Sequence, residues 1–235
     1  MKTNIVDLPK VKDVYITLLP GNDFRDITKK AKELIESGFN PVPHFPARSI
    51  KNMANLKDYV NTCKDIGVKQ ALIIGGSAQP IGDFHCSLQL LETRLFEGFK
   101  IGIAGHPDGS PDISESDLEK AMKDKIPYAD YIVTQWSLES NSIIEFISKQ
   151  TLPVHVGITG PLKITSLLKF ATIVGAKNSL NFIKSNATRA VDLLKPNDPN
   201  VLIDKLKNVS ESFHIYTFGS LKQTNQWLME NNYVK

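Results

Sequence analysis

Residues 101–106 read Ile-Gly-Ile-Ala-Gly-His, a short apolar run that ends in a small residue and a polar one. Runs of this kind recur roughly every 25–30 residues, and amphipathic stretches separate most of them. This spacing is typical of a strand–crossover–strand unit, and a series of such units predicts a parallel α/β sheet, most simply a (β/α) barrel of the TIM type. The runs lie at residues 14–17, 40–44, 71–76, 101–106, 131–135, 154–158 and 214–219.

Helical patterns fill most of the intervals between these runs. Apolar residues at helical spacing, or acids before an apolar run, predict helices at 23–37, 55–66, 88–96, from 114–117 onward, 141–148, 162–174, 179–194 and 201–209. Between residues 157 and 213 no run reads as a strand, so seven strands are predicted where a closed barrel has eight. Either residues 4–6 form a reduced first strand or the first strand is missing. A missing strand would leave sheet edges to be covered by the N-terminal arm, a helix or a second subunit.

Length and composition predict one soluble domain. The chain has 235 residues, with 41% hydrophobic and 23% charged residues, which suits a single barrel domain over residues 1–235. A formal net charge of +3 argues against nucleic-acid or membrane partners. Two unpatterned cysteines and a start without an apolar signal core predict a cytoplasmic protein. No metal-ligand spacing, P-loop or dinucleotide fingerprint occurs in the sequence, so no metal site is predicted.

The ends of the predicted strands nominate a site, because barrel enzymes hold their chemistry at the carboxyl ends of the strands. Gly75 and Gly76 would let a ligand approach backbone amides, although a tight turn explains them equally well. His106 and Asp108 offer a titratable pair in a loop shaped by proline and glycine. The candidate residues at strand ends are Thr17, His44, Gly75, Gly76, Ser77, His106, Gln135, Gly157 and Thr217.

Three further side chains have both a chemical and a structural interpretation. The imidazole of His44 can donate to a ligand or support a neighbouring loop. Gln135 carries a donor and an acceptor on one planar head, which would complement a flat heterocycle or tie two strands together. Arg48 is a candidate partner for a phosphate or carboxylate, or else a solvated charge. His155 and His214 alternate with apolar neighbours, which favours packing in the core.

Five segments, in order, resemble the methylenetetrahydrofolate reductase family, a family of flavin-using (β/α) barrels. They lie between about residues 14 and 227: Val-Pro-His-Phe at 42–45, the loop 101–111, the strand 129–135 that ends in Thr-Gln, Pro-Val-His-Val-Gly-Ile at 153–158, and the last strand at 213–218. Residues 75–84 and 161–163 resemble a short, divergent bacterial branch of that family.

The resemblance implies a cytoplasmic oxidoreductase of folate one-carbon metabolism. Such a flavoprotein interconverts 5,10-methylene- and 5-methyl-tetrahydrofolate by hydride transfer through FAD, with NADH or NADPH as the electron donor and a tetrahydrofolate derivative as the ligand. By this resemblance Gln135 would contact the pterin. The residues that would line the flavin are Thr17, His44, Ile74, Gly75, Gly76 and His106.

Two departures from the family pattern concern acids. Ser77 stands where the family has an aspartate beside the flavin, and the strand that carries a glutamate acid has no counterpart here. A hydroxyl can donate a hydrogen bond but supplies no charge. Ser77 would therefore act with another acid, for which Asp83, Asp108 or His106 are nearest in sequence. The alternatives are a folate-binding protein without reductase activity and a flavin-free one-carbon enzyme. A homo-oligomer would follow if a barrel position were empty.

Overall fold

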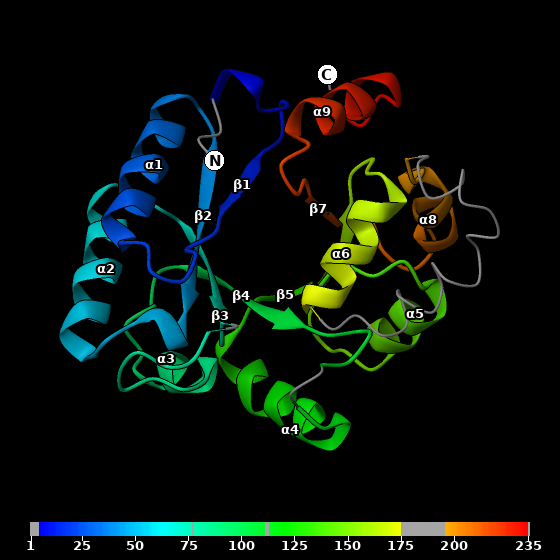
Figure 1. Cartoon of the computed structure of the whole chain (residues 1–235). Coiled ribbons are helices and arrows are strands. Elements are labelled where there is room, and N and C mark those ends of the chain that lie inside the picture. The colour runs from blue at the N-terminus through cyan, green and yellow to red at the C-terminus, as the bar shows by residue number, and fades with distance from the viewer. Residues whose placement is uncertain (1–4, 77, 111–112, 175–195, 235) are drawn as a thin grey trace. The chain divides into compact units, whose positions relative to one another are not determined.

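A computed structural model describes residues 5–76, 78–110, 113–174 and 196–234 (Figure 1). The chain divides into two compact units, which are described separately here. The β1–β4 unit consists of Lys10–Ala104 and Lys123–Tyr131. The β5–β7 unit consists of Met1–Pro9, Gly105–Met122 and Ile132–Lys235. The prediction of a single domain is not tested by this division.

Seven strands occur among the described residues, and their order in the sheet is their order in the sequence, β1 to β7. Every pairing whose register is known is parallel: β1 with β2, β2 with β3, β3 with β4, β5 with β6, and β6 with β7. The strands are β1 (Asp13–Ile16), β2 (Asn40–Pro46), β3 (Gln70–Ile74), β4 (Lys100–Gly105), β5 (Tyr131–Thr134), β6 (Val154–Thr159) and β7 (Phe213–Tyr216).

Helices follow the strands, as in βα units. They are α1 (Phe24–Glu36), α2 (Met53–Asp65), α3 (Ser87–Glu92), α4 (Glu115–Lys125), α5 (Ser140–Ser148), α6 (Ile164–Val174), α8 (Pro199–Leu206) and α9 (Leu221–Glu230), with 3-10 turns η1 (Ile5–Asp7), η2 (Ala47–Ser49) and η3 (Ile126–Tyr128). Local chemistry sets several boundaries. The side chain of Asp23 caps α1 by accepting a hydrogen bond from the backbone N–H of Arg25. The side chain of Asn52 caps α2 by accepting one from the backbone N–H of Asn55. Gly38, just after α1, has φ +84°, a conformation that glycine adopts freely.

The core of the β1–β4 unit lies between its strands and its helices. In Figure 1, α1 and α2 run beside β2. Phe45 of β2 is fully buried and stacks on Tyr59 of α2, with ring centroids 4.0 Å apart. It also meets Phe96 edge-on at 5.0 Å. Side chains alternate along a strand, so the burial of Phe45 toward the helices turns His44 to the opposite face of the sheet.

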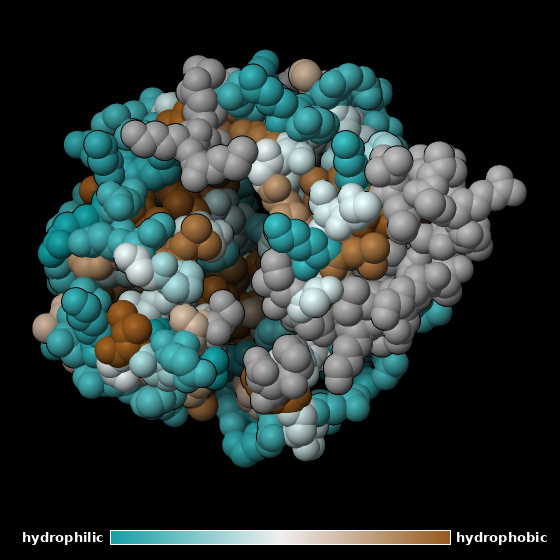
Figure 2. All heavy atoms as spheres, viewed as in Figure 1, coloured by the Kyte–Doolittle hydropathy of each residue, from teal (hydrophilic) through white to brown (hydrophobic). Residues whose placement is uncertain are grey.

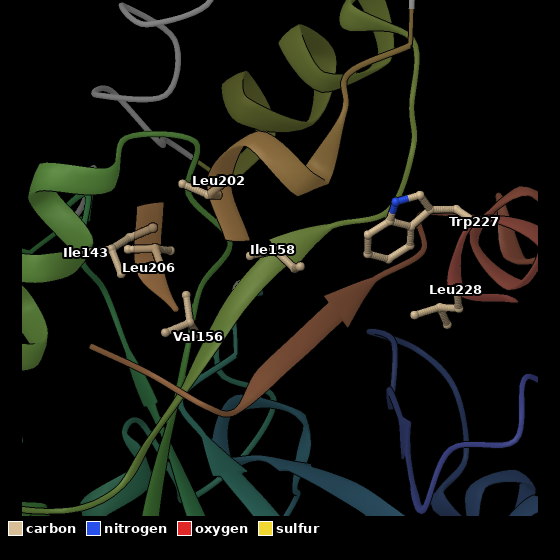
Figure 3. Packing of buried hydrophobic residues seen from close by; sticks show 7 residues of the cluster. All are labelled: Ile143, Val156, Ile158, Leu202, Leu206, Trp227 and Leu228. Atoms are coloured by element: carbon tan, nitrogen blue, oxygen red, sulfur yellow. The ribbon is translucent and has the colours of Figure 1, made fainter. Parts of the chain in front are cut away.

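The core of the β5–β7 unit is an aliphatic cluster with one indole (Figure 3). Ile143 of α5, Val156 of β6 and Leu206 of α8 point toward one another, and each is fully buried. Leu202, Ile158, Trp227 and Leu228 complete the cluster. The cluster joins α5, α8 and α9 to β6, so burial of apolar area helps to hold these helices against the strand.

The α/β fold class of TIM type that the sequence predicts is confirmed by this topology. The suggested reduced strand at residues 4–6 is not seen, because residues 5–7 form the 3-10 turn η1. Each predicted strand is present, and β2 extends two residues beyond His44, to Pro46. The predicted helix 179–194 lies outside the described residues. Within the described part of the chain, no helix has the length and apolar character needed to cross a membrane.

Candidate functional site

The predicted site residues fall into two groups, one in each unit. Thr17, His44, Ile74, Gly75, Gly76 and Asp83 belong to the β1–β4 unit, whereas His106, Asp108, Gln135, Gly157 and Thr217 belong to the β5–β7 unit. Ser77, one of the three residues predicted to be catalytic, lies outside the described residues.

His44 is the most unusual polar group of the β1–β4 unit. Its side chain is buried, with 9% of the residue exposed, and neither ring nitrogen has a hydrogen-bond partner among the described residues. The hydroxyl of Tyr59 donates to its backbone oxygen at 3.1 Å, which fixes the main chain but leaves the ring unsatisfied. Burial lowers the pKa of His44 from 6.5 to about 4. At neutral pH the imidazole is therefore uncharged, with one N–H donor and one acceptor nitrogen.

The face of the sheet that carries His44 is partly polar. The ring of Tyr15, on β1, lies edge-on to the imidazole, with centroids 6.1 Å apart. Its hydroxyl donates to that of Tyr131 at 3.4 Å. The Tyr131 ring fits there because residue 102 is glycine: a Cβ at Gly102 would lie 2.7 Å from the ring. Burial raises the pKa of Tyr131 to about 12, so its phenol stays protonated at neutral pH.

Two loops meet beyond the carboxyl ends of β2 and β3. The backbone N–H of Arg48, in η2, donates to the oxygen of Gly75 at 3.0 Å, and the N–H of Ile81 donates to the oxygen of Arg48 at 3.1 Å. Gly76 has φ +88°, and a Cβ there would approach that of Pro46 to 3.2 Å. The glycine pair predicted from the sequence is therefore required in part by local geometry.

The remaining predicted residues of this unit occupy separate positions around these loops. Ile74 is the last residue of β3, where it pairs with Pro46. Thr17 follows β1 and is exposed. Asp83 is also exposed, and its backbone N–H donates to the oxygen of Lys51 at 3.0 Å. The structure therefore does not bury Asp83 as an acid beside the imidazole.

In the β5–β7 unit the buried ionisable group is Asp108, which is 8% exposed. It accepts a hydrogen bond from the hydroxyl of Ser137 at 2.7 Å. The backbone N–H of Gln135 donates to the oxygen of Gly105 at 2.8 Å, which ties the end of β5 to the end of β4. His106, at the start of the same loop, is half-buried. Ser137 was not recognised from the sequence, although it lies only two residues beyond Gln135.

Thr134 and Gly157 form a close contact at the ends of β5 and β6. The N–H of Gly157 donates to the side-chain hydroxyl of Thr134 at 2.7 Å. A Cβ at Gly157 would lie 2.3 Å from the backbone oxygen of Thr134. The hydroxyl of Tyr216 donates to that backbone oxygen at 3.1 Å. Thr217 is half-buried just after β7. His155 and His214, predicted to pack in the core, are also half-buried.

A metal ion in a protein is held by a cluster of His, Cys, Asp or Glu side chains. Among the described residues, no group of three or more His, Cys, Asp or Glu side chains is placed to hold a metal ion.

Comparison with known proteins supports the fold class but no specific activity and no residue role. No protein-family model matches the chain. Oxaloacetate acetylhydrolase has a similar structure, with a TM-score of 0.53 at 11% identity over 95% of this chain and 74% of its own. A candidate phosphonomutase from Burkholderia cenocepacia has a TM-score of 0.45 at 9% identity, over 66% of this chain and 67% of its own.

These findings overturn the resemblance to methylenetetrahydrofolate reductases, because no family model matches and the neighbour with a TM-score of 0.53 is an oxaloacetate acetylhydrolase. The folate oxidoreductase function inferred from that resemblance is wrong on the same finding, and so are its cofactors, FAD and NADH or NADPH. Neither alternative, a folate-binding protein or a flavin-free one-carbon enzyme, gains support. The physical reason is that the matched segments are mostly strands and their ends, and apolar strands that end in small residues occur in parallel barrels of many chemistries.

Proposed function

We propose that the chain is a (β/α)-barrel enzyme that acts at a carbonyl group, with the neutral imidazole of His44 as the hydrogen-bond donor to the carbonyl oxygen. The observation that carries this proposal is the buried ring with two unpartnered nitrogens. A buried polar group without a partner costs free energy, and such groups are uncommon in folded proteins. Single unpartnered atoms also occur in Gln70, Trp136, Thr224 and Trp227, whereas His44 has two.

The physical chemistry favours a donor over a general base. With a pKa of about 4, His44 is a weak proton acceptor at neutral pH. Its N–H can instead stabilise the negative charge that develops on a carbonyl oxygen as an enolate or a tetrahedral oxyanion forms. No proton leaves the imidazole in this step. Exclusion of water around a buried donor strengthens such a hydrogen bond.

The fold comparison is consistent with this proposal. Oxaloacetate acetylhydrolase, by its name, acts on oxaloacetate, which contains a ketone carbonyl. At 11% identity that likeness gives no residue roles, so the assignment of His44 rests on the burial and the missing partners.

The test is a substrate screen with variants. The protein is incubated with oxaloacetate, pyruvate and other small carbonyl compounds, and their consumption is followed by proton NMR against a protein-free control. His44→Ala is expected to lower the rate about 100-fold or more, which is the effect of losing one donor to an oxyanion. His155→Gln is the control, because His155 lies near the amino end of β6. Full activity in His44→Ala would refute the role of the imidazole.

A further inference from the structure

We propose that Arg48 binds a carboxylate of the substrate, so that the substrate class is a carbonyl compound that also carries a carboxylate. This inference rests on the proposed function for its carbonyl half. The inference that a carboxylate binds rests only on the hydrogen bonds and the charge of Arg48.

Arg48 lies just beyond the carboxyl end of β2, and its side chain reaches over the end of β3. Nε donates to the backbone oxygen of His85 at 3.0 Å, and Nη1 approaches the backbone oxygen of Gly76 at 3.4 Å. Gly76 lies directly beside this side chain, because a Cβ there would be in van der Waals contact with the Cβ of Arg48, at 3.7 Å. The backbone N–H of Arg48 also donates to Gly75, so both ends of the residue are fixed.

The charge of Arg48 has no acidic partner in the described part of the chain. A guanidinium has five N–H donors, and the two contacts above use two of them. Carbonyl oxygens satisfy these hydrogen bonds without neutralising the charge. A half-buried cation is more stable beside an anion, and the planar guanidinium fork matches two oxygens of a carboxylate.

Arg48 and His44 lie on the same stretch of chain at the end of β2, which is why we assign them to one ligand. They are four residues apart on one continuous segment, so their Cα atoms are separated by at most about 14 Å. A ligand with a carboxylate near its carbonyl, such as a 2-oxo acid, would place the charge at Arg48 and the ketone oxygen at His44.

The competing interpretation is that Arg48 only ties the loop after β3 to the loop after β2. A structural role of this kind would lower the melting temperature of an Arg48 variant without any dependence on carboxylates. Binding and stability must therefore be measured in the same variants.

The experiment is an NMR titration of the whole chain that observes the Nε–H of Arg48 and the ring nitrogens of His44. The signals are assigned with Arg48→Lys and His44→Ala. Acetate, pyruvate, methyl pyruvate and inorganic phosphate are the probes. Pyruvate is expected to shift both residues with saturation, acetate to shift Arg48 alone, and methyl pyruvate to shift His44 alone. If acetate shifts Arg48 but no carbonyl compound shifts His44, the carboxylate site stands and the proposed function fails.

Three variants complete the test. Arg48→Gln is expected to weaken acetate and pyruvate binding at least tenfold, whereas Lys69→Gln is expected to leave it unchanged. Lys69 is an exposed cation just before β3, so the control removes the same charge at the opposite end of that strand. Arg48→Lys keeps the charge if Arg48→Gln fails to fold, and it should weaken acetate binding more than phosphate binding. Unchanged acetate binding in both Arg48 variants, or no saturable shift of Arg48 with any anion, would overturn the proposal.

Discussion

The two units differ in how they treat a buried ionisable group near a strand end. In the β5–β7 unit, the carboxylate of Asp108 accepts a hydrogen bond from Ser137 at 2.7 Å. In the β1–β4 unit, the imidazole of His44 is equally buried and has no partner among the described residues. The hydrogen bond between Ser137 and Asp108 stabilises the folded chain. The unpartnered imidazole of His44 costs stability, which is why we assign it to ligand binding.

The two units also differ in the space around their glycines. Gly157, in the β5–β7 unit, touches the backbone of Thr134, whereas Gly75, in the β1–β4 unit, has open space where a Cβ would lie. Figure 2 shows that hydrophilic residues cover much of the visible face and that hydrophobic residues appear there as separate patches.

The largest expected effect is that of Gly157→Ala. The new Cβ would lie 2.3 Å from a backbone oxygen, which cannot move without disturbing β5. We expect a loss of about 3 kcal/mol in the free energy of unfolding. Gly75→Ala is the matched control and should change it by less than about 0.5 kcal/mol. Urea unfolding measures both, and equal effects would contradict the contrast.

Ser137→Ala should have the next largest effect. It removes a hydroxyl that donates to a buried carboxylate, and hydrogen bonds to charged groups contribute about 2 kcal/mol. Ser148→Ala removes an exposed hydroxyl that donates to the backbone of Glu145, and it should cost much less. If the two variants unfold at the same urea concentration, Asp108 does not depend on Ser137.

The pH dependence of stability should report on His44. Its pKa is about 4 in the folded chain and near 6.5 when exposed, so between these values the unfolded chain binds more protons. The free energy of unfolding is therefore highest above pH 6.5, where the ring is neutral in both states, and it falls as the pH decreases toward 4. The expected slope is at most about 1.4 kcal/mol per pH unit. His44→Leu should flatten the curve in this window, and an unchanged curve would show that another group causes it.

The smallest effect is expected for His44→Leu at pH 7, and it has the opposite sign. Replacing an unsatisfied buried polar group by an apolar one should raise the free energy of unfolding by about 1 kcal/mol. The same variant should lose carbonyl binding. A clear loss of stability would show that the ring makes contacts that this account does not include.

The sequence predicts the strands and most helices because their signals are local. Apolar runs with turn residues locate β3 and β4, and helical periodicity locates α1 and α2 within one or two residues. The position of His44 was predicted less well, since it lies inside β2 rather than at its end. The cause is that β2 continues to pair with β3 as far as Pro46, and pairing is a tertiary property.

The chemistry of the site was harder to predict than its place in the fold. Neither the missing partners of His44 nor the donor to Asp108 leaves a signal in the sequence, because both depend on residues brought together by folding. Short strand-end segments suggested a reductase family that the comparisons do not support. Strand-end patterns reflect the constraints of a parallel barrel, and many chemistries share them.

The measurement that tests the central claim most directly is an NMR pH titration of the His44 ring nitrogens, with and without pyruvate. The account predicts a ring that stays neutral from pH 8 to about pH 5 and whose N–H signal shifts when pyruvate binds. A ring that protonates near pH 6.5, or one whose signal is unchanged at saturating pyruvate and oxaloacetate, would contradict it.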